Sequence, residues 1–137
     1  MNTNKVILDT NALLHHFLDD IPEQTKQVAS LLHQARLHQL EILVPQIVIF
    51  ELYYALDKYY HLDKSDIIDK LKTLVSTDYL RVEARHTLLS ALKLHANTDQ
   101  LSLPDCFLFS LSLNTNTPIF TFDQKLKKAI QKNARFL

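Results

Sequence analysis

The stretch VILDTNALLHHF, residues 6–17, begins as a short apolar run and then places Asp9, Thr10 and Asn11 in succession. The apolar run predicts a buried strand over 5–9, and the residues that follow predict a helix over 11–18. All three polar residues are good helix N-caps, so capping is the simple structural interpretation. The alternative is that a strand-end carboxylate belongs to a site that other acids of the chain complete.

The remainder of the chain continues this alternation of short β-like runs with helical segments. Strands alternating with helices predict right-handed crossovers and a mainly parallel sheet covered on both faces, with ligands bound at the carboxyl ends of the strands. The length fits one domain over residues 1–137. The further predicted strands are 41–45, 79–83, 118–123 and 134–137, and the further predicted helices are 23–39, 46–60, 63–76, 86–96, 104–114 and 124–132.

The composition excludes several classes of protein. With 15 basic and 15 acidic residues the net charge is zero, so no bulk field attracts nucleic acid or a membrane. The absence of glycine excludes the G-x-G-x-x-G and Walker phosphate-binding loops. The single Cys106 cannot form an intramolecular disulfide, which suits a reducing compartment. The sequence shows neither a signal peptide nor an apolar run of roughly 20 residues, so we expect a cytoplasmic protein without a membrane helix.

Three further acids occupy positions comparable to that of Asp9. Asp123 closes the predicted strand 118–123, and Asp105 lies in the first turn of the helix that Pro104 opens. Taken singly, each is explained most simply by N-capping or by the helix dipole. Glu51 lies on a largely apolar face of the helix 46–60, and a carboxylate buried there needs a cation or strong hydrogen-bond donors. A salt bridge to a nearby lysine or arginine, or a place at the helix edge, is the structural alternative for Glu51.

Taken together, the four acids indicate more than capping. If Asp9, Glu51, Asp105 and Asp123 converge, their like charges raise one another's pKa unless a cation is present. Clustered carboxylates form an oxygen-only site, which suits Mg²⁺ or Mn²⁺. Mg²⁺ commonly completes its coordination shell with water and substrate phosphate oxygens, so this donor set indicates metal-assisted phosphoester hydrolysis.

The ordered motifs ILDTN, IVIFELYYAL around Glu51, LSLPDCFLFSLS around Asp105 and PIFTFDQKL around Asp123 resemble the PIN domain. More narrowly, they resemble the small single-domain PIN ribonucleases that act as VapC-type toxins of bacterial toxin–antitoxin pairs. The resemblance covers almost the whole chain, including its length and the order of its elements. It implies an α/β fold, a three-layer αβα sandwich around a mainly parallel central sheet.

The resemblance also implies a function, the hydrolysis of RNA phosphodiester bonds by a Mg²⁺- or Mn²⁺-dependent endoribonuclease. The four acids would be both the metal ligands and the catalytic residues, and the bound ion would activate a water for attack on the phosphate. Thr10, Asn11 and Thr121 would orient the carboxylates, and each is equally well explained as a capping or strand residue.

Three partners follow from the resemblance: an RNA substrate, a cognate antitoxin that inserts a segment into the acidic pocket, and a second copy of the chain in a homodimer. The aromatic segment 53–60 is the candidate dimer surface. Two positions depart from the family pattern. Lys125 stands where many relatives carry another acid, and the loop NTNTP at 114–118 lacks the glycine that is common there, a role that asparagine can fill because it adopts positive φ.

Other functions remain open on the sequence alone. A PIN-type nuclease that processes RNA outside a toxin system, or a non-catalytic interaction module, fits the same fold. A phosphotransferase of the haloacid-dehalogenase type needs Asp-x-Asp at the first strand end, where this chain has Asn11, and a receiver-like domain needs an acidic pair before its phosphoacceptor. A basic cluster fits either contact with RNA phosphate or a solvent-exposed helix face; it comprises Lys125, Lys127, Lys128 and Lys132.

Overall fold

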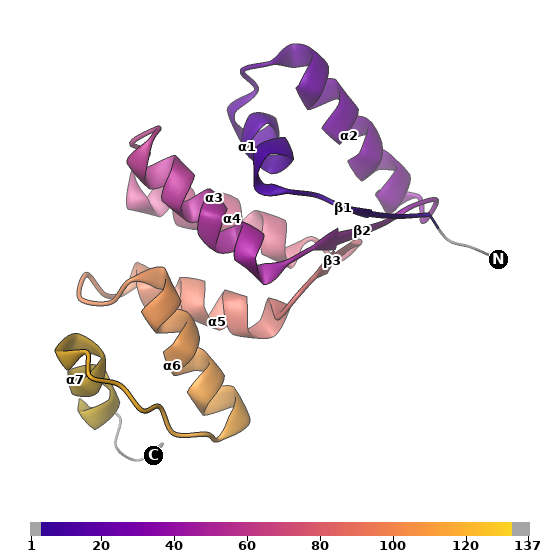
Figure 1. Ribbon diagram of the computed structural model, residues 1–137. Helices are drawn as coiled ribbons and strands as arrows, with labels where there is room; N and C mark the ends of the chain where they lie inside the picture. The colour runs from indigo at the N-terminus through magenta and orange to yellow at the C-terminus, as the bar shows by residue number, and fades with distance from the viewer. Residues whose placement is uncertain (1–3, 133–137) are drawn as a thin grey trace. The chain divides into compact units, whose positions relative to one another are not determined.

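The computed structural model describes residues 4–132 of the chain. It divides into two compact units, unit 1 over Met1–Arg85 and unit 2 over His86–Leu137, and each is described by itself (Figure 1). The single domain expected over residues 1–137 stays a prediction. The elements are β1 (Lys5–Ile7), α1 (Thr10–Leu18), α2 (Pro22–Arg36), β2 (Glu41–Val44), α3 (Gln46–Lys58), α4 (Lys64–Ser76), β3 (Leu80–Val82), α5 (Arg85–Ala96), α6 (Leu103–Thr115) and α7 (Gln124–Lys132).

Unit 1 is built on a parallel sheet with the strand order β1-β2-β3 (Figure 1). The register aligns Val6 with Ile42 and Ile42 with Leu80. Ile42 and Leu80 are buried on one face of the sheet, whereas Ile7 points to the other face and is 64% exposed. The predicted α/β class with a parallel sheet is confirmed. Because the strands are parallel, their carboxyl ends lie at one edge of the sheet, and Asp9 follows β1 at this edge.

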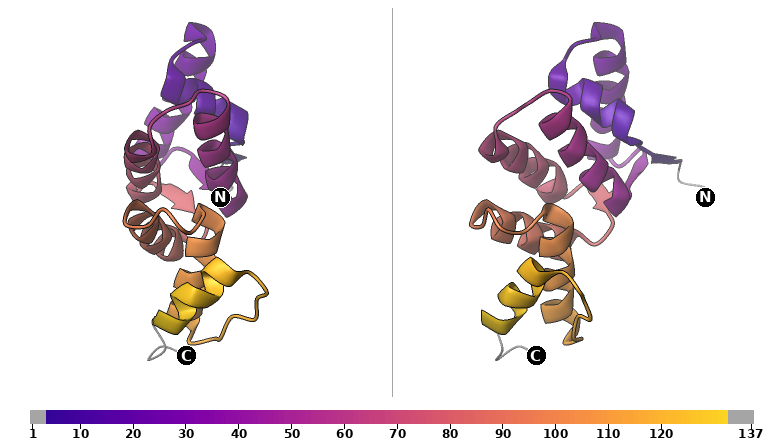
Figure 2. Two further views of the ribbon diagram at one scale, coloured as in Figure 1. Left: turned by 90° about the vertical axis from the view of Figure 1, so that its left-hand side faces the viewer. Right: turned by 60° about the vertical axis from the view of Figure 1, so that its left-hand side comes forward.

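The helices of unit 1 pack through fully buried aliphatic side chains. α1 packs against α2 and α3, and α3 packs against α4 (Figure 2). Leu13 of α1, Leu52 and Leu56 of α3, and Ile67 and Leu71 of α4 have no exposed surface. Burying one such side chain contributes about 1.5–3 kcal/mol. This cluster therefore fixes the helices that follow β1 and β2, and with them the loops at the carboxyl edge of the sheet.

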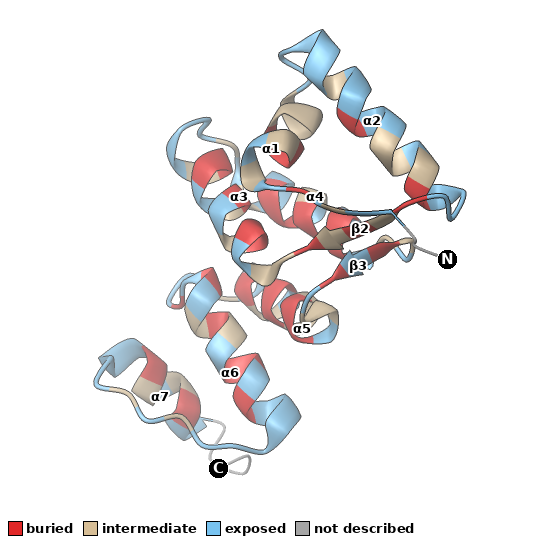
Figure 3. Cartoon of the chain, turned by 45° about the vertical axis from the view of Figure 1, so that its right-hand side comes forward, coloured by how far each residue is buried: buried red, intermediate tan, exposed pale blue. Residues whose placement is uncertain are grey.

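Unit 2 consists of helices, and its described residues 86–132 include no strand. Leu92 of α5, Leu103 of α6 and Leu126 of α7 are buried at its core. Buried and exposed positions alternate along α7, as expected for a helix with one apolar stripe (Figure 3). Within residues 4–132, every helix is too short or too polar to traverse a bilayer.

The chain contains no glycine, so its tightest turns use other residues. Asn116 ends α6 in the left-handed conformation, with φ of 50°, and its backbone N–H donates to the carbonyl of Leu113. This confirms that an asparagine of the loop at 114–118 adopts positive φ, which its side chain tolerates better than most. Among residues 4–132, the others with positive φ are Asp19, His38, His61 and Ala84.

The prediction of a strand over 118–123 is wrong, since these residues have no regular secondary structure. Phe120 and Phe122 are 86% and 79% exposed, and their rings contact each other edge to face at a centroid distance of 5.2 Å. A strand requires a hydrogen-bonded neighbour, and all three strands of the described chain belong to unit 1. The alternation of apolar residues resembles that of a strand, but it does not supply the neighbouring strand that hydrogen bonding requires. The predicted strand 134–137 lies outside the described residues.

Candidate active site

Asp9 follows β1 at the carboxyl edge of the sheet in unit 1. Its backbone is extended, and its Oδ1 accepts a hydrogen bond of 2.9 Å from the N–H of Ala12, so the capping interpretation is correct. Within the described chain, Oδ2 has neither a hydrogen bond nor an ion pair, and the side chain is exposed. The cap therefore fixes the direction of the carboxylate while leaving one oxygen available to a ligand.

Asp123 repeats this arrangement in unit 2. Its Oδ1 accepts a hydrogen bond of 2.9 Å from the N–H of Leu126, in the first turn of α7. The backbone N–H of Asp123 in turn donates to Oγ1 of Thr121 at 3.0 Å. Thr121, which the sequence predicts as a positioning residue, therefore restrains the backbone of Asp123 through this hydrogen bond. The second carboxylate oxygen of Asp123 contacts no donor among the described residues.

Asp105 is the third residue of α6 and is half-buried. Its backbone N–H donates to Oγ of Ser102 at 3.2 Å, so Ser102 rather than Asp105 caps this helix. The carboxylate is therefore not used as the cap, and it lies in the first turn, where the positive end of the helix dipole stabilises a negative charge.

Glu51 lies in the middle of α3 and is exposed, so the expectation that it is buried on an apolar face is wrong. Its neighbours one turn away explain the difference: Val48 and Ala55 are buried, but Ile47 and Tyr54 are 58% and 56% exposed. Apolar residue types at helical spacing predicted burial, yet part of this face is open to solvent. Glu51 therefore needs no compensating cation for stability, and it has no ion pair within residues 4–132.

Thr10 and Asn11 are the first two residues of α1. Thr10 is half-buried and Asn11 is exposed, and neither side chain makes a hydrogen bond within the described chain. Both side chains stand next to the Asp9 cap, in the turn where the backbone N–H groups of α1 are not used by the helix itself. Their predicted role in orienting the carboxylates stays a prediction.

The four predicted acids divide between the units, with Asp9 and Glu51 in unit 1 and Asp105 and Asp123 in unit 2. Across residues 4–132, no three Asp, Glu, His or Cys side chains are grouped as ligands of one ion, and convergence of the four stays a prediction. No lysine or arginine of that range neutralises any of these carboxylates. Uncompensated carboxylates are the type of ligand that hard divalent cations such as Mg²⁺ or Mn²⁺ prefer.

Glu83 is an acid at the carboxyl edge of the sheet that the sequence analysis passed over. Its Oε1 accepts a hydrogen bond of 3.0 Å from the backbone N–H of Gln46, at the start of α3. The N-cap of that helix is Pro45, whose side chain cannot cap it. The signal was present, because Glu83 closes the predicted strand 79–83 as Asp9 closes the first strand. Its hydrogen bond assigns it a structural role.

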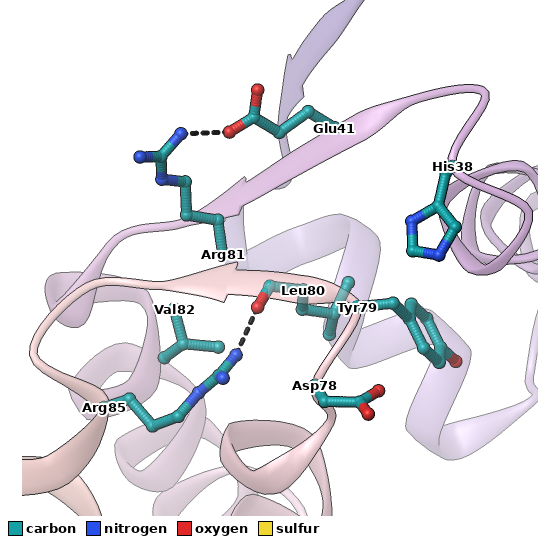
Figure 4. Close-up of a pocket in the computed structure, with 8 residues that line it drawn as sticks. All are labelled: His38, Glu41, Asp78, Tyr79, Leu80, Arg81, Val82 and Arg85. Atoms are coloured by element: carbon teal, nitrogen blue, oxygen red, sulfur yellow. Dashed lines mark hydrogen bonds and ion pairs between the residues drawn. The ribbon is translucent and has the colours of Figure 1, made fainter.

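A pocket of about 360 Å³ lies at the opposite edge of the sheet, where β2 and β3 begin (Figure 4). Arg81 forms an ion pair with Glu41, and the guanidinium of Arg85 donates to the backbone carbonyl of Leu80. The hydrogen bond from Arg81 lowers the pKa of Glu41. None of the four predicted acids lines this pocket.

Comparison with known proteins identifies the family of the chain. Residues 6–131 match the PIN domain family. The chain is also similar to a protein named VapC ribonuclease from Aquifex aeolicus (strain VF5), with 28% identity over 100 residues, which are 73% of this chain and 73% of that protein. The matched range begins within β1 and ends within α7, and it includes each of the four acids. The protein therefore belongs to the PIN domain family.

Proposed function

We propose that the protein is a Mg²⁺- or Mn²⁺-dependent endoribonuclease, the toxin of a type II toxin–antitoxin pair, in which Asp9, Glu51, Asp105 and Asp123 bind the metal ion. Membership of the PIN domain family and similarity to a protein named VapC ribonuclease support the reaction class. The assignment to these four residues is supported by one observation: within the described residues, none of the four carboxylates forms an ion pair. We also propose that residues 1–137 form one domain, which acts on RNA in the cytoplasm.

A divalent ion held by carboxylates lowers the pKa of bound water and neutralises charge that develops on the phosphate oxygens. The chain's own contribution is orientation. Asp9 and Asp123 each hold one carboxylate oxygen on a helix N-terminus, at 2.9 Å in both cases, so the remaining oxygen has a restricted direction. Thr121 restrains the backbone of Asp123, and Thr10 and Asn11 are the corresponding candidates beside Asp9.

The test is cleavage of RNA by the purified full chain, with Mg²⁺ or Mn²⁺ and with a chelator. Asp9→Asn and Asp105→Asn should each reduce metal-dependent cleavage roughly a hundred-fold or more, because a ligand charge is lost while the side-chain shape is kept. Asp69→Asn, an exposed aspartate of α4, is the matched control and should cleave as the natural chain does. Undiminished cleavage by both site variants would refute the assignment.

Calorimetric titration with Mg²⁺ or Mn²⁺ provides a readout that does not depend on turnover. Binding should be lost in the site variants and kept in the control. A natural chain that binds neither ion and cleaves no RNA would instead be a non-catalytic interaction module of PIN fold. A chain that cleaves RNA but leaves cell growth unaffected when expressed alone would be an RNA-processing nuclease outside a toxin system.

The proposed partners are an RNA substrate, a cognate antitoxin and a second copy of the chain. The segment 53–60 supports the dimer surface, because Tyr54 and Tyr59 are 56% and 70% exposed and their rings contact edge to face at 6.0 Å. Exposed aromatic pairs are common at protein interfaces. A short neighbouring reading frame whose product binds DNA and suppresses the growth effect would identify the antitoxin.

A further inference from the structure

Unit 2 contains a groove of about 560 Å³ between α7 and the end of α5. One wall is formed by Lys125, Lys128 and Lys132 of α7, and the other includes Leu94 of α5 and Leu101 of the loop that follows. The groove is thus basic on one side, and on the other it combines the two leucines with Thr98 and Gln100. It lies entirely within unit 2 and contains none of the four predicted acids.

The three lysines form one row on the helix. Their spacing of three and four residues places them on the same face, and the row extends about 10 Å along the axis at 1.5 Å per residue. All three are exposed, and none has an ion-pair partner in residues 4–132. Three uncompensated positive charges in a line suit an extended polyanion better than a single small anion.

Lys127, the fourth lysine of the basic cluster, is separate from this row. Its Nζ lies 5.8 Å from the centroid of the Phe122 ring, and the residue is half-buried. It does not line the groove. The structure therefore divides the cluster into three lysines that face the groove and one that covers an aromatic ring, which provides an internal control for any test of the row.

The leucines opposite the lysines favour one kind of polyanionic ligand over another. Leu94 is half-buried and leaves an apolar surface beside the charges, whereas Leu101 lines the groove but is buried, and Thr98 and Gln100 add polar groups. A strand of RNA alternates phosphates with planar, largely apolar bases, so it can place phosphates on the lysines and a base or ribose on the leucines. In an acidic peptide the carboxylates and the apolar groups belong to different side chains, whereas each nucleotide of RNA carries a phosphate and a base together.

We propose that this groove binds the backbone of the single-stranded RNA substrate, with phosphates on Lys125, Lys128 and Lys132 and one nucleoside against Leu94 and Leu101. The inference rests on the proposed function and extends it by naming a substrate-binding surface on α7. Because the net charge of the chain is zero, the local row is what supplies attraction for RNA.

The test measures binding of a labelled single-stranded RNA to the full chain by fluorescence anisotropy, with a chelator present so that no cleavage occurs. Each lysine-to-alanine substitution in the row should weaken binding roughly five-fold at 0.1 M salt, and the triple variant roughly a hundred-fold, from a salt slope of about 0.7 per phosphate contact. The slope of log K against log salt should fall by about 2 in the triple variant. Circular dichroism checks that the variants remain folded.

Lys127→Ala and Lys93→Ala are the matched controls, because each removes one charge from a lysine outside the groove of unit 2. Both should bind RNA within about two-fold of the natural chain. Unchanged affinity and salt slope in the triple variant would overturn the proposal. Competition by polyglutamate of equal charge as effective as that by RNA would also overturn it, and would mark the groove as a site for an acidic peptide.

The outcome is separable from that of the proposed function. If the natural chain cleaves no RNA but the triple variant loses RNA binding, the groove stands and the nuclease assignment fails. If the chain cleaves RNA and the triple variant binds it normally, the groove fails and the nuclease assignment stands. With both correct, the triple variant should show a raised KM and a nearly unchanged kcat.

Discussion

Asp9 has two assigned roles, a helix cap that the structure shows and a metal ligand that we propose, and two substitutions separate them. Asp9→Ala removes both the hydrogen bond of 2.9 Å to Ala12 and the charge. It should lower the free energy of unfolding by about 1 kcal/mol without metal, the usual loss for an N-cap replaced by alanine. Asp9→Asn keeps a capping oxygen and should cost only a few tenths of a kcal/mol, because asparagine caps as well as aspartate.

Metal then distinguishes the natural chain from both variants. At a Mg²⁺ or Mn²⁺ concentration a hundred times the dissociation constant, the natural chain should gain about 2.7 kcal/mol of stability by linkage. Asp9→Asn should gain almost none despite its intact cap, because an amide oxygen lacks the charge that holds a hard cation. The assay is urea denaturation with and without metal, read by circular dichroism.

Asp63 supplies the matched control. It is the N-cap residue of α4, but its side chain makes no cap hydrogen bond. Asp63→Ala should therefore lower stability by less than about 0.5 kcal/mol and leave the stabilisation by metal intact. Equal losses in Asp63→Ala and Asp9→Ala would show that the Asp9 hydrogen bond is not the cause, and stabilisation of Asp9→Asn by metal to the natural extent would refute its role as a ligand.

Four further outcomes follow from the described contacts. Arg85→Met removes a part-buried guanidinium that donates to two backbone carbonyls and should lower the free energy of unfolding by about 1–3 kcal/mol in urea titrations. Leu71→Ala empties a fully buried site in α4 and should cost about 2–5 kcal/mol by the same measurement. The hydrogen bond from His15 lowers the pKa of Asp20. This pair therefore stabilises the fold above the unfolded pKa of about 3.9, and the stabilisation is lost as pH falls through the lower pKa of the folded state. Asp20→Asn should make unfolding less sensitive to acid below about pH 4. Tyr54→Ser should convert the proposed dimer to monomer in light scattering, and a natural chain that is already monomeric contradicts that surface.

Sequence reasoning succeeded where a pattern has one physical cause. The helix predicted over 124–132 has those bounds in the structure, because its apolar residues Leu126 and Ile130 repeat at helical spacing and Asp123 caps its first turn. It failed where the cause lies outside the segment. The residues 118–123 have the composition of a strand, but pairing depends on a neighbour that composition does not supply. The predicted burial of Glu51 is wrong for a related reason, because apolar residues at helical spacing show which face of a helix can be buried and not what covers it.

The candidate site shows the same division. From the sequence, capping and metal binding compete as explanations of Asp9 and Asp123. In the structure the cap uses only one of the two oxygens of each carboxylate. Sequence alone could not reveal this, because it depends on which oxygen meets the helix. Nor could it separate Lys127 from the other lysines of its cluster, since its cation–π contact with Phe122 arises from the irregular segment before α7.

Five of the described residues, none of them glycine, adopt left-handed conformations, and they connect the geometry of the turns with the entropy of folding. A non-glycine residue held in that region carries about 1–2 kcal/mol of local strain, least for asparagine and aspartate and more for His38, His61 and Ala84. Glycine would relieve the strain, but it would enlarge the conformational freedom of the unfolded chain. Because the 137 residues include no glycine, the unfolded chain has fewer accessible conformations and loses less conformational entropy on folding. The backbone strain at these turns offsets part of that gain.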